Sequence, residues 1–328
     1  MAASASKARL ASALAAGVAG AAALALLYRW SRQRLRVARI VVYPIKGCKG
    51  IPVRSARVQP EGLEHDREFI VVCPAEDGNT GWRFMTQREL PALALVEPSM
   101  PTSTGGNKFT VKAPGMQELS VSFPDAGAKR IALDVFGAAA EGLDCGDSAA
   151  AWFAEFLQAP GARLLRHVGV RRIDEAFAEG VTRFSDGYPL MVLTEASLAS
   201  VERTTGLGLA LQRFRPNLVL AGAGPYSEDG AKGVTCGSGA AAVRLPFVKP
   251  CARCQVPSVD PILGARGRDP LRDLRASRSG RALRDQRTAM PGHYRRNLGA
   301  VFLGQNAVPE LAAGSEGLLA VGDAAEWM

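Results

Sequence analysis

The amino-acid sequence predicts a β-rich α+β protein preceded by a single apolar N-terminal helix. From about residue 36 onward, short apolar runs alternate with clusters of Gly, Pro, Asn and Asp, which is typical of strands joined by turns. Helical periodicity is confined to a few short stretches, so a barrel or sandwich is favoured over a doubly wound parallel sheet. The chain has 328 residues and is 47% hydrophobic, which suffices for a packed core in one large domain or two.

Residues 1–36 form an apolar leader with a basic flank. The run over residues 10–28 carries no charge and is long enough to cross a bilayer as a helix. More basic residues follow this run than precede it, so the positive-inside rule places its C-terminal side in the cytosol. A cleavable organelle transit peptide, also rich in Arg and free of acids, is the alternative. The uninterrupted length of the run favours a signal anchor.

Seven strands are predicted in the first half of the chain. Each is a short run rich in β-branched and aromatic residues, bounded by turn residues. They are expected over residues 39–42, 53–58, 69–73, 93–97, 109–112, 119–123 and 130–135.

Two amphipathic helices are predicted next. The first is expected to begin with Ser148 as its N-cap, because Trp152 and its apolar neighbours recur at helical spacing until Pro160 ends the pattern. The second is expected to begin at Thr194 and to end at Gly206. The apolar faces of both helices are most simply core.

The second half adds buried strands over residues 217–221 and 243–248. We expect a domain boundary near residue 165, between an N-terminal β domain of residues 37–165 and a second domain of residues 166–328. Neither an internal repeat nor a Gly/Ser-rich linker is visible, so the two domains are expected to pack closely.

The net charge of +9 is concentrated at the N-terminus. Residues 1–60 contain eleven Lys and Arg and no acidic residue, so the rest of the chain is nearly neutral. No stripe of aromatic and basic residues of the kind that binds single strands is present, and nucleic acid is not an expected partner. Because the sequence contains neither a Gly-x-Gly-x-x-Gly fingerprint nor a Walker motif, NADH is not expected to bind directly.

The pair Cys251 and Cys254 is the most informative feature of the chain. A zinc site would need two further ligands at metal spacing, which the other cysteines and the three histidines do not offer. A thioredoxin-like redox pair would lie at a helix N-terminus, whereas Pro257 and Pro261 favour an extended turn. The simplest alternative is a pair of small buried residues. The six cysteines form no disulfide framework, which indicates a reducing compartment.

Four separated motifs occur in one order along the chain. They are Tyr43-Pro44-Ile45-Lys46-Gly47-Cys48, Asp66-Arg67, Phe214-Arg215-Pro216-Asn217, and Cys251-Ala252-Arg253-Cys254 followed by Val259-Asp260-Pro261. This order resembles the MOSC family, and within it the amidoxime-reducing components, from about residue 37 almost to the C-terminus. The resemblance implies a MOSC β-barrel-type domain packed with an N-terminal β domain, and a segment of residues 43–67 that contributes to the cofactor site.

The resemblance also implies a molybdenum cofactor, whose metal is held by molybdopterin, a pyranopterin dithiolene, and by one protein thiolate. Cys254 is the implied metal ligand and catalytic residue, since thiolates suit a soft, redox-active metal, whereas Cys251 is not a ligand in the family. Arg253 would lower the pKa of the neighbouring thiol and contact the pterin phosphate. The other implied cofactor-binding residues are Lys46, Gly47, Arg67, Asp186, Gly187, Tyr188, Arg215, Asn217 and Ala252. Gly47 and Ala252 stand where serines are expected in the animal relatives.

The function implied by the resemblance is the reduction of N-hydroxylated compounds, such as amidoximes and hydroxylamines, to amidines and amines, with nitrite as a further substrate. Electrons would come from NADH through NADH-cytochrome b5 reductase and cytochrome b5, with nitrate reductase as an alternative partner. The implied location is the mitochondrial outer membrane with the catalytic part in the cytosol, or an organelle matrix if the leader is a cleaved transit peptide. We expect a monomer. The alternative function is a cofactor carrier or sulfuration module without reductase activity, but such modules follow a desulfurase domain, and here only the leader precedes.

A run of arginines lies between Arg266 and Arg296, with only three aspartates to offset it. Asp269 followed by proline predicts a helix start, and arginines spaced by three would wind round that helix. A solvated charged surface and a docking patch for an acidic haem protein such as cytochrome b5 are both compatible with this run. In the second interpretation Arg275 and Arg278 would take part in docking.

Overall fold

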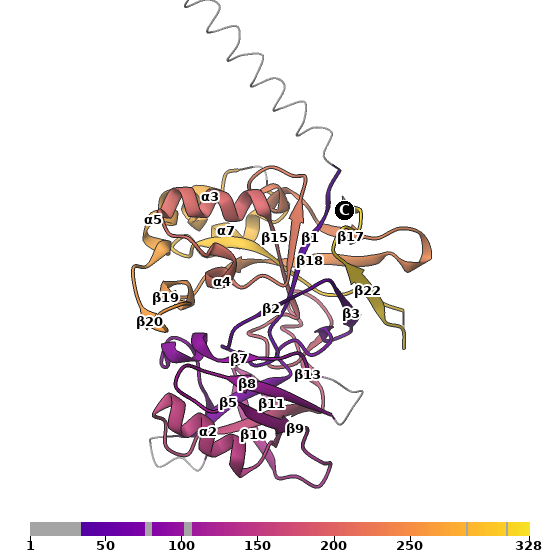
Figure 1. The fold of residues 1–328 in the computed structure, drawn as a ribbon. Coiled ribbons are helices and arrows are strands. Elements are labelled where there is room, and N and C mark those ends of the chain that lie inside the picture. Colours follow the sequence, from indigo (N-terminus) through magenta and orange to yellow (C-terminus); the bar gives the residue numbers. More distant parts are fainter. Residues whose placement is uncertain (1–33, 76–80, 102–106, 287, 313) are drawn as a thin grey trace, which may run out of the picture.

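The computed structural model describes residues 34–75, 81–101, 107–286, 288–312 and 314–328. Two lobes are visible in Figure 1, one built mainly from the first half of the chain and the other mainly from the second half. The anchor predicted over residues 10–28 lies outside the described residues. Within them, no helix is both long and apolar enough to span a membrane.

The largest sheet of the described chain joins its beginning to its second half. Its eight strands lie in the order β2 (Ile51–Val53), β1 (Arg36–Val42), β16 (Leu218–Ala221), β15 (Leu190–Thr194), β21 (Phe302–Ala307), β18 (Val243–Ala252), β17 (Gly233–Cys236) and β23 (Ala325–Trp327). β1 pairs antiparallel with β16, placing Ile40 opposite Leu218, and β15 pairs with β16 in parallel. The first described strand therefore belongs to the lobe of the second half, and the chain that follows it enters the junction of the lobes.

The other lobe is built on a sheet of five antiparallel strands. Their order is β10 (Arg130–Val135), β11 (Ala138–Asp144), β12 (Arg163–Val168), β5 (Phe69–Pro74) and β6 (Trp82–Phe84). Helix α2 (Asp147–Leu157) packs beside β12, and its Trp152 and Phe153 join Phe69 and Phe109 in one buried cluster. The aromatic face of α2 is core, as predicted.

Shorter elements complete the described chain. The small sheets are β22 (Gly317–Ala320), β3 (Ser55–Gln59) and β4 (Gly62–Leu63); β7 (Glu97–Pro98), β8 (Lys108–Lys112) and β9 (Leu119–Ser122); β13 (Arg171–Arg172) and β14 (Val181–Thr182); and β19 (Val259–Asp260) and β20 (Ala265–Arg266). The helices are α3 (Glu195–Thr205), α4 (Ala210–Phe214), α5 (Pro270–Arg278), α6 (Gly280–Leu283) and α7 (Pro291–Arg296), with 3₁₀ turns η1 (Pro91–Leu95), η2 (Ser227–Gly230), η3 (Gly239–Ala241) and η4 (Val256–Ser258). The predicted β-rich α+β class is confirmed.

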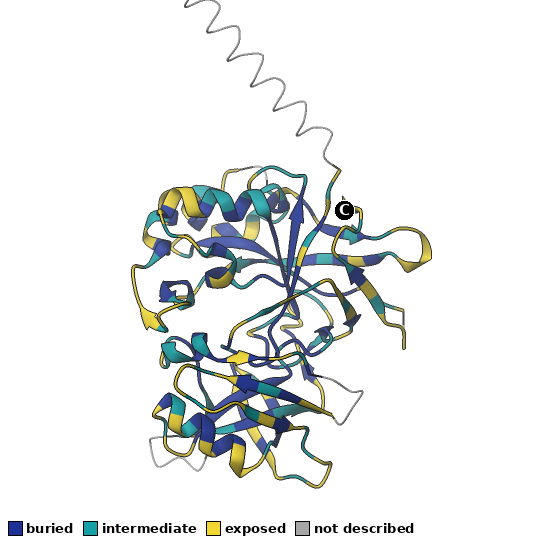
Figure 2. Ribbon diagram, in the orientation of Figure 1, coloured by how far each residue is buried: buried dark blue, intermediate teal, exposed yellow. Residues whose placement is uncertain are grey.

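The burial of each strand follows its place in the sheets. Alternate residues of β10 are buried and exposed, which is the period expected of a strand with one solvated face. All five residues of β15 are buried, because this strand lies inside the large sheet with α3 packed nearby (Figure 2). The polar residues that build the site lie on the loops leaving these buried strands.

Two strand predictions were wrong. The segment predicted as a strand over residues 93–97 is mostly the 3₁₀ turn η1, which begins at Pro91, where a missing N–H costs nothing. A buried apolar run this short fits a helix or a strand equally well by periodicity. The strand predicted over residues 53–58 is two strands, because the chain leaves the large sheet after Val53 and pairs with β22 from Ser55 onward.

Helix caps were predicted with mixed success. Thr194 caps α3, since its Oγ1 accepts the backbone N–H of Ser197 at 3.1 Å. The cap predicted at Ser148 is wrong, because α2 begins at Asp147 with Gly146 as its N-cap. The φ of Gly146 is 94°, a value that side chains disfavour, so the chain enters this helix through a glycine.

Candidate functional site

A cavity between the two lobes brings the predicted site together. Ten of the eleven predicted cofactor or metal residues line it, namely Lys46, Gly47, Arg67, Asp186, Gly187, Tyr188, Arg215, Asn217, Arg253 and Cys254. The eleventh, Ala252, is exposed at the end of β18 and is not among the lining residues. Five cationic side chains and one carboxylate line this cavity, so its walls favour an anionic ligand.

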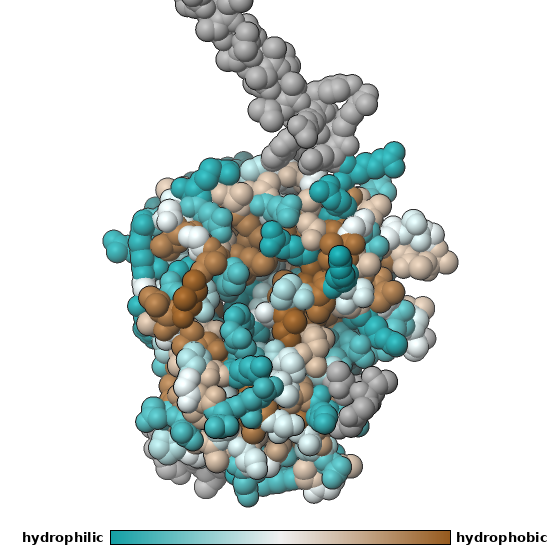
Figure 3. Space-filling view, in the orientation of Figure 1, coloured by the Kyte–Doolittle hydropathy of each residue, from teal (hydrophilic) through white to brown (hydrophobic). Residues whose placement is uncertain are grey.

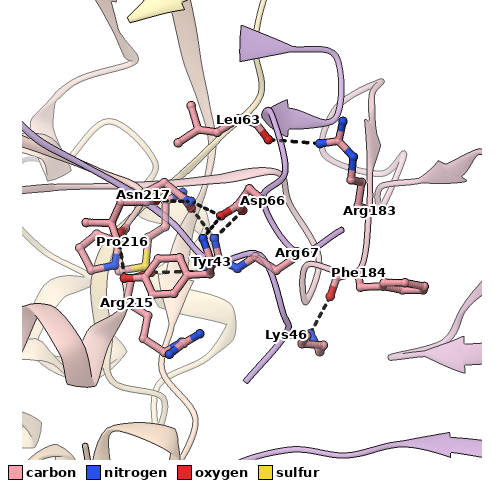
Figure 4. Close-up of polar contacts among 12 residues, drawn as sticks. Tyr43, Lys46, Leu63, Asp66, Arg67, Arg183, Phe184, Arg215, Pro216 and Asn217 are labelled. Carbon is pink, nitrogen blue, oxygen red and sulfur yellow. Dashed lines mark hydrogen bonds and ion pairs between the residues drawn. The ribbon is translucent and has the colours of Figure 1, made fainter. Parts of the chain in front are cut away.

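A buried carboxylate holds the first wall of the cavity (Figure 4). Asp66, only 1% exposed, accepts the backbone N–H of Tyr43 at 2.8 Å and the Asn217 side-chain amide at 2.9 Å. Its second oxygen lies 2.5 Å from Nη1 of Arg67, and the same nitrogen donates to Oδ1 of Asn217 at 2.9 Å. Asn217 was predicted as a cofactor contact, but its amide orients Arg67 toward the cavity.

Two arginines stack against one tyrosine at this wall. The guanidinium carbons of Arg67 and Arg215 lie 4.2 Å and 4.3 Å from the centroid of the Tyr43 ring. Both arginines have positive φ, 46° and 57°, a backbone strain of order 1 kcal/mol each that is typical of functional sites. The Tyr43 hydroxyl donates to the carbonyl of Pro216 at 3.2 Å, and burial raises the pKa of this phenol to about 12.

Arg215 differs from Arg67 in its partners. Within the described part of the chain, its guanidinium has no hydrogen-bond acceptor and contacts only the Tyr43 ring. Burial lowers the pKa of Arg215, although a guanidinium remains charged at neutral pH. A charged, half-buried donor without an acceptor at a cavity wall is an incomplete contact, which an anionic ligand would complete.

The predicted turn of residues 184–189 forms the second wall. Nζ of Lys46 donates to the carbonyl of Phe184 at 2.9 Å and forms an ion pair with Asp186. The side chain of Asp186 is exposed, so desolvation at the cavity wall opposes its charge only in part, and the ammonium of Lys46 holds the pKa of this carboxyl below its usual range. Lys46 and Asp186 therefore neutralise each other, and most of the basic character of the cavity comes from its arginines.

Arg171 holds this turn from behind, and no sequence motif indicated it. Its side chain is buried, and its two terminal nitrogens donate to four carbonyls, those of Arg183 at 2.8 Å, Ser185 at 2.6 Å, Val135 at 2.9 Å and Asp186 at 3.1 Å. No carboxylate in the described chain forms an ion pair with it. One guanidinium thus fixes the backbone that presents residues 185–188 to the cavity.

The two cysteines of the Cys-x-x-Cys pair lie in different surroundings. Cys251 is on β18 and half-buried, so its interpretation as a small buried residue was only partly right, whereas Cys254 is exposed on the loop that follows. Nη1 of Arg253 lies 2.9 Å from Sγ of Cys251, and its Nη2 donates to the carbonyl of Phe214 at 2.9 Å. Arg253 was expected to act on the neighbouring Cys254 thiol, whereas its guanidinium lies against the sulfur of Cys251.

The loop after Cys254 is held by a second buried arginine that sequence reasoning missed. Arg213 donates to the carbonyls of Pro257 at 3.2 Å and Val259 at 2.9 Å, and to Oδ2 of Asp260 at 2.8 Å. The other oxygen of Asp260 accepts the backbone N–H groups of Ile262 and Leu263, which makes it a turn residue, as anticipated. The position of Arg213 directly before the Phe214 motif was the available signal.

Gly47 fills a position that a serine would strain. Its φ is 82°, and a Cβ there would lie 3.3 Å from Cδ1 of Leu93. Its carbonyl accepts the side-chain amide of Gln87, a buried residue that lines the cavity and that the sequence did not indicate. The left-handed backbone at residue 47 therefore favours glycine over serine, and no side-chain hydroxyl is available here.

Comparisons with known proteins match most of the chain. The model of the MOSC N-terminal beta barrel domain matches residues 34–160, and that of the MOSC domain matches residues 179–326. The chain belongs to the MOSC family. Among MOSC relatives, mitochondrial amidoxime-reducing component 1 of Mus musculus is 32% identical over 283 residues, covering 80% of this chain and 79% of the mouse protein. Component 1 of Homo sapiens is 32% identical over 256 residues, covering 74% and 72%, and component 2 of Macaca fascicularis is 30% identical over 283 residues, covering 80% of each. The resemblance drawn from the four motifs is confirmed.

The donors of the cavity fit the molybdenum cofactor that MOSC domains bind. Among the described residues, no three His, Cys, Asp or Glu side chains could hold a metal ion together. Two cysteines line the cavity: Cys254, which is exposed, and Cys251, which is half-buried and contacts Arg253. Cys254 is therefore the thiol more available to a metal whose other ligands would come from an organic group. Nε of Arg253 and the hydroxyl of Tyr188 are buried in the wall without a partner in the part of the chain that is described. With Arg215 they are donors suited to a phosphorylated, anionic ligand.

The arginine run over residues 266–296 divides into two kinds of residue. Arg278 was predicted to take part in docking, which is wrong: it is 3% exposed, pairs with Asp229 at 2.6 Å and donates to the carbonyl of Phe302 at 3.0 Å. Arg275 is exposed, although Nη1 donates to the carbonyl of Gly299 at 2.8 Å. Because the arginines recur every third residue, Arg278 falls on the buried face of α5 with Leu271 and Leu274, while most of the other arginines face solvent.

Proposed function

We propose that this MOSC protein is a molybdenum-dependent reductase that converts N-hydroxylated compounds, such as amidoximes and hydroxylamines, to amidines and amines. The observation that carries the proposal is the meeting of Cys254, the more exposed of the two cysteines that line the cavity, with three arginines from separate loops. The names of relatives about 30% identical, all amidoxime-reducing components, support it.

In this proposal each wall of the cavity has one task. Cys254 supplies the thiolate ligand, and Arg215, whose donors are free, binds the phosphate together with Arg67. In the proposal, the arginines and the turn held by Arg171 are already fixed before the cofactor binds. Binding therefore costs little conformational entropy. When bound, a molybdenum pyranopterin dithiolene supplies a centre that takes up and delivers two electrons.

The proposed reaction is balanced by two electrons and two protons. The N–O bond of the substrate breaks with uptake of two electrons; the nitrogen gains one proton, and the departing hydroxyl takes the other and leaves as water. Electrons come from NADH through NADH-cytochrome b5 reductase and cytochrome b5, with nitrate reductase as an alternative partner, and nitrite is a further substrate. The exposed arginines of residues 266–296, without Arg278, are the proposed surface for such an acidic partner.

The proposed location follows the names of the relatives, which include the word mitochondrial. In the proposal, residues 10–28 anchor the chain in the outer membrane and the catalytic part faces the cytosol, as the basic flank of the leader favours. The protein is proposed to act as a monomer.

The test is a pair of variants at the two cysteines. Cys254→Ser replaces a soft thiolate by a poor hydroxyl ligand, so bound molybdenum and benzamidoxime turnover are expected to fall to background. Cys251→Ser keeps both within about twofold, because Cys251 supplies no metal ligand in the proposal. Molybdenum should be measured by elemental analysis of the purified proteins. Full metal content and turnover in Cys254→Ser would contradict the assignment, and stoichiometric metal without turnover in the unaltered protein would favour the carrier function.

A further inference from the structure

A second concave site adjoins the proposed cofactor cavity. It is a groove of about 550 Å³, a size typical of small-molecule sites. Residues of both lobes line it, and its apolar members are Val41, Pro52, Ala94, Leu95, Pro114, Leu209, Leu211, Pro261 and Ile262. Hydrophobic side chains gather over α4 and the β19–β20 hairpin beside a hollow in Figure 3.

The charges at the edge of the groove are largely compensated. Lys49 forms an ion pair with Glu97, and Arg39 lies 3.7 Å from Glu195. These exposed pairs leave little net charge for recognition. Arg215 is the remaining charged residue of the lining, and it lies where the groove meets the cavity. The rest of the groove therefore favours an uncharged apolar body over an ion.

The groove reaches the cavity at a shared wall. Gln87 and Arg215 line both spaces, and the ring of Tyr43, on which Arg215 stacks, lines the groove. A molecule lying in the groove thus ends against the residues that bound the cavity of Cys254. This continuity sets the groove apart from an isolated surface hollow.

One side of the groove is fixed in place by close packing. Gly264, in the β19–β20 hairpin, approaches Leu95 so closely that a Cβ on the glycine would lie 2.6 Å from the leucine side chain. Asp260 holds the same hairpin by accepting two backbone N–H groups. Because the hairpin follows the Cys254 loop and rests on the opposite lobe, it forms a preformed wall that needs no rearrangement to receive a ligand.

We propose that this groove binds the apolar substituent of an N-hydroxylated substrate, an aryl or medium-length alkyl group, while the N-hydroxyl group faces the cavity beyond Arg215 and Gln87. The inference rests on the proposed function and adds a substrate class to it. Substrates with an apolar substituent bind more tightly than hydroxylamine itself, which has nothing to place in the groove.

Two neighbouring residues offer a matched pair of variants. Ile262 and Leu263 are similarly exposed, at 69% and 72%, but only Ile262 lines the groove. With the full-length enzyme, Ile262→Asp is expected to raise the KM for benzamidoxime relative to that for hydroxylamine roughly tenfold. Leu263→Asp is expected to leave this ratio unchanged. An unchanged ratio in Ile262→Asp, or an equal rise in both variants, would overturn the proposal.

A binding measurement separates failure of the groove from failure of the reductase function. N-phenyl-1-naphthylamine, an uncharged aromatic dye, is titrated into the same proteins and its fluorescence is followed. Saturable binding that benzamidoxime displaces, and that Ile262→Asp weakens roughly tenfold while Leu263→Asp does not, supports the groove even if no N-reduction is detected. Dye binding that is insensitive to Ile262→Asp, or that benzamidoxime does not displace, overturns the inference even in an active enzyme.

Discussion

Arg171 and Arg213 hold two different loops of the same cavity, and they do so with different partners. Each donates four hydrogen bonds and each is buried, with exposures of 3% and 7%. The partners of Arg171 are carbonyls alone, whereas Arg213 also pairs with the carboxylate of Asp260. A buried cation can therefore fix a loop with or without a carboxylate partner.

The difference predicts which loop depends more on its arginine. The turn of residues 184–187 is also held by Lys46, which donates to the carbonyl of Phe184, but Arg171 provides the donors for three further carbonyls, those of Arg183, Ser185 and Asp186. The loop after Cys254 also has Asp260, which keeps its two backbone N–H donors without Arg213. Replacement of Arg171 should therefore lower the free energy of unfolding more than replacement of Arg213.

The largest effect is expected for Arg171→Met. The substitution leaves four carbonyls without their donors, so the free energy of unfolding is expected to fall by about 3 kcal/mol. Urea unfolding of the variant and of the unaltered protein measures this loss. Arg172→Met is the matched control, because Arg172 is exposed and pairs only with Glu175, and its effect should stay within about 0.5 kcal/mol. A loss below about 1 kcal/mol in Arg171→Met would contradict the role given to this arginine.

A smaller effect is expected for Arg213→Met, about 2 kcal/mol in the same measurement. Because Arg213 holds the loop that follows Cys254, bound molybdenum should fall along with stability. The exposed Arg203, on α3, gives the control Arg203→Met, which should change neither quantity. If Arg213→Met destabilised the protein more than Arg171→Met, the carboxylate partner would be the decisive contact, and the comparison would be reversed.

The sequence predicted much of the site but little of what holds it. Motifs carry the residues that face a ligand, and ten of eleven lie on one cavity. Arg171 and Arg213 make their contacts with backbone carbonyls, which any sequence supplies, so no residue pattern marks them. Arg253 was expected to act on the thiol of Cys254, its neighbour in sequence, but its guanidinium contacts Cys251, because adjacency in sequence does not by itself bring two side chains together.

The fold shows the same limit. Alternating patterns such as that of β10 were recognised, and so were the buried runs of β5 and β16. The fully buried β15 was missed, because it continues directly into α3 and no turn residue marks its end. The pairing of β1 with β16 was also out of reach, since strands about 180 residues apart share no local signal.

The smallest predicted effect is on a neighbouring histidine and reports the charge of Arg171 directly. Burial, followed by the charges of Arg183 and Arg171, lowers the pKa of His167 to about 4, while Glu68 acts in the opposite direction. Because this folded-state pKa lies below the usual 6.5, protonation opposes folding, and stability is lost as the pH falls from about 6.5 through 4. Arg171→Met removes one cation, so the pKa of His167 should rise toward 6.5. The pH range over which protonation of His167 reduces stability should then be narrower. Titration of the His167 ring by NMR measures the change, with Arg213→Met as the control in which the pKa stays the same. An equal pKa of His167 in both variants would contradict a direct effect of the charge of Arg171 on this ring.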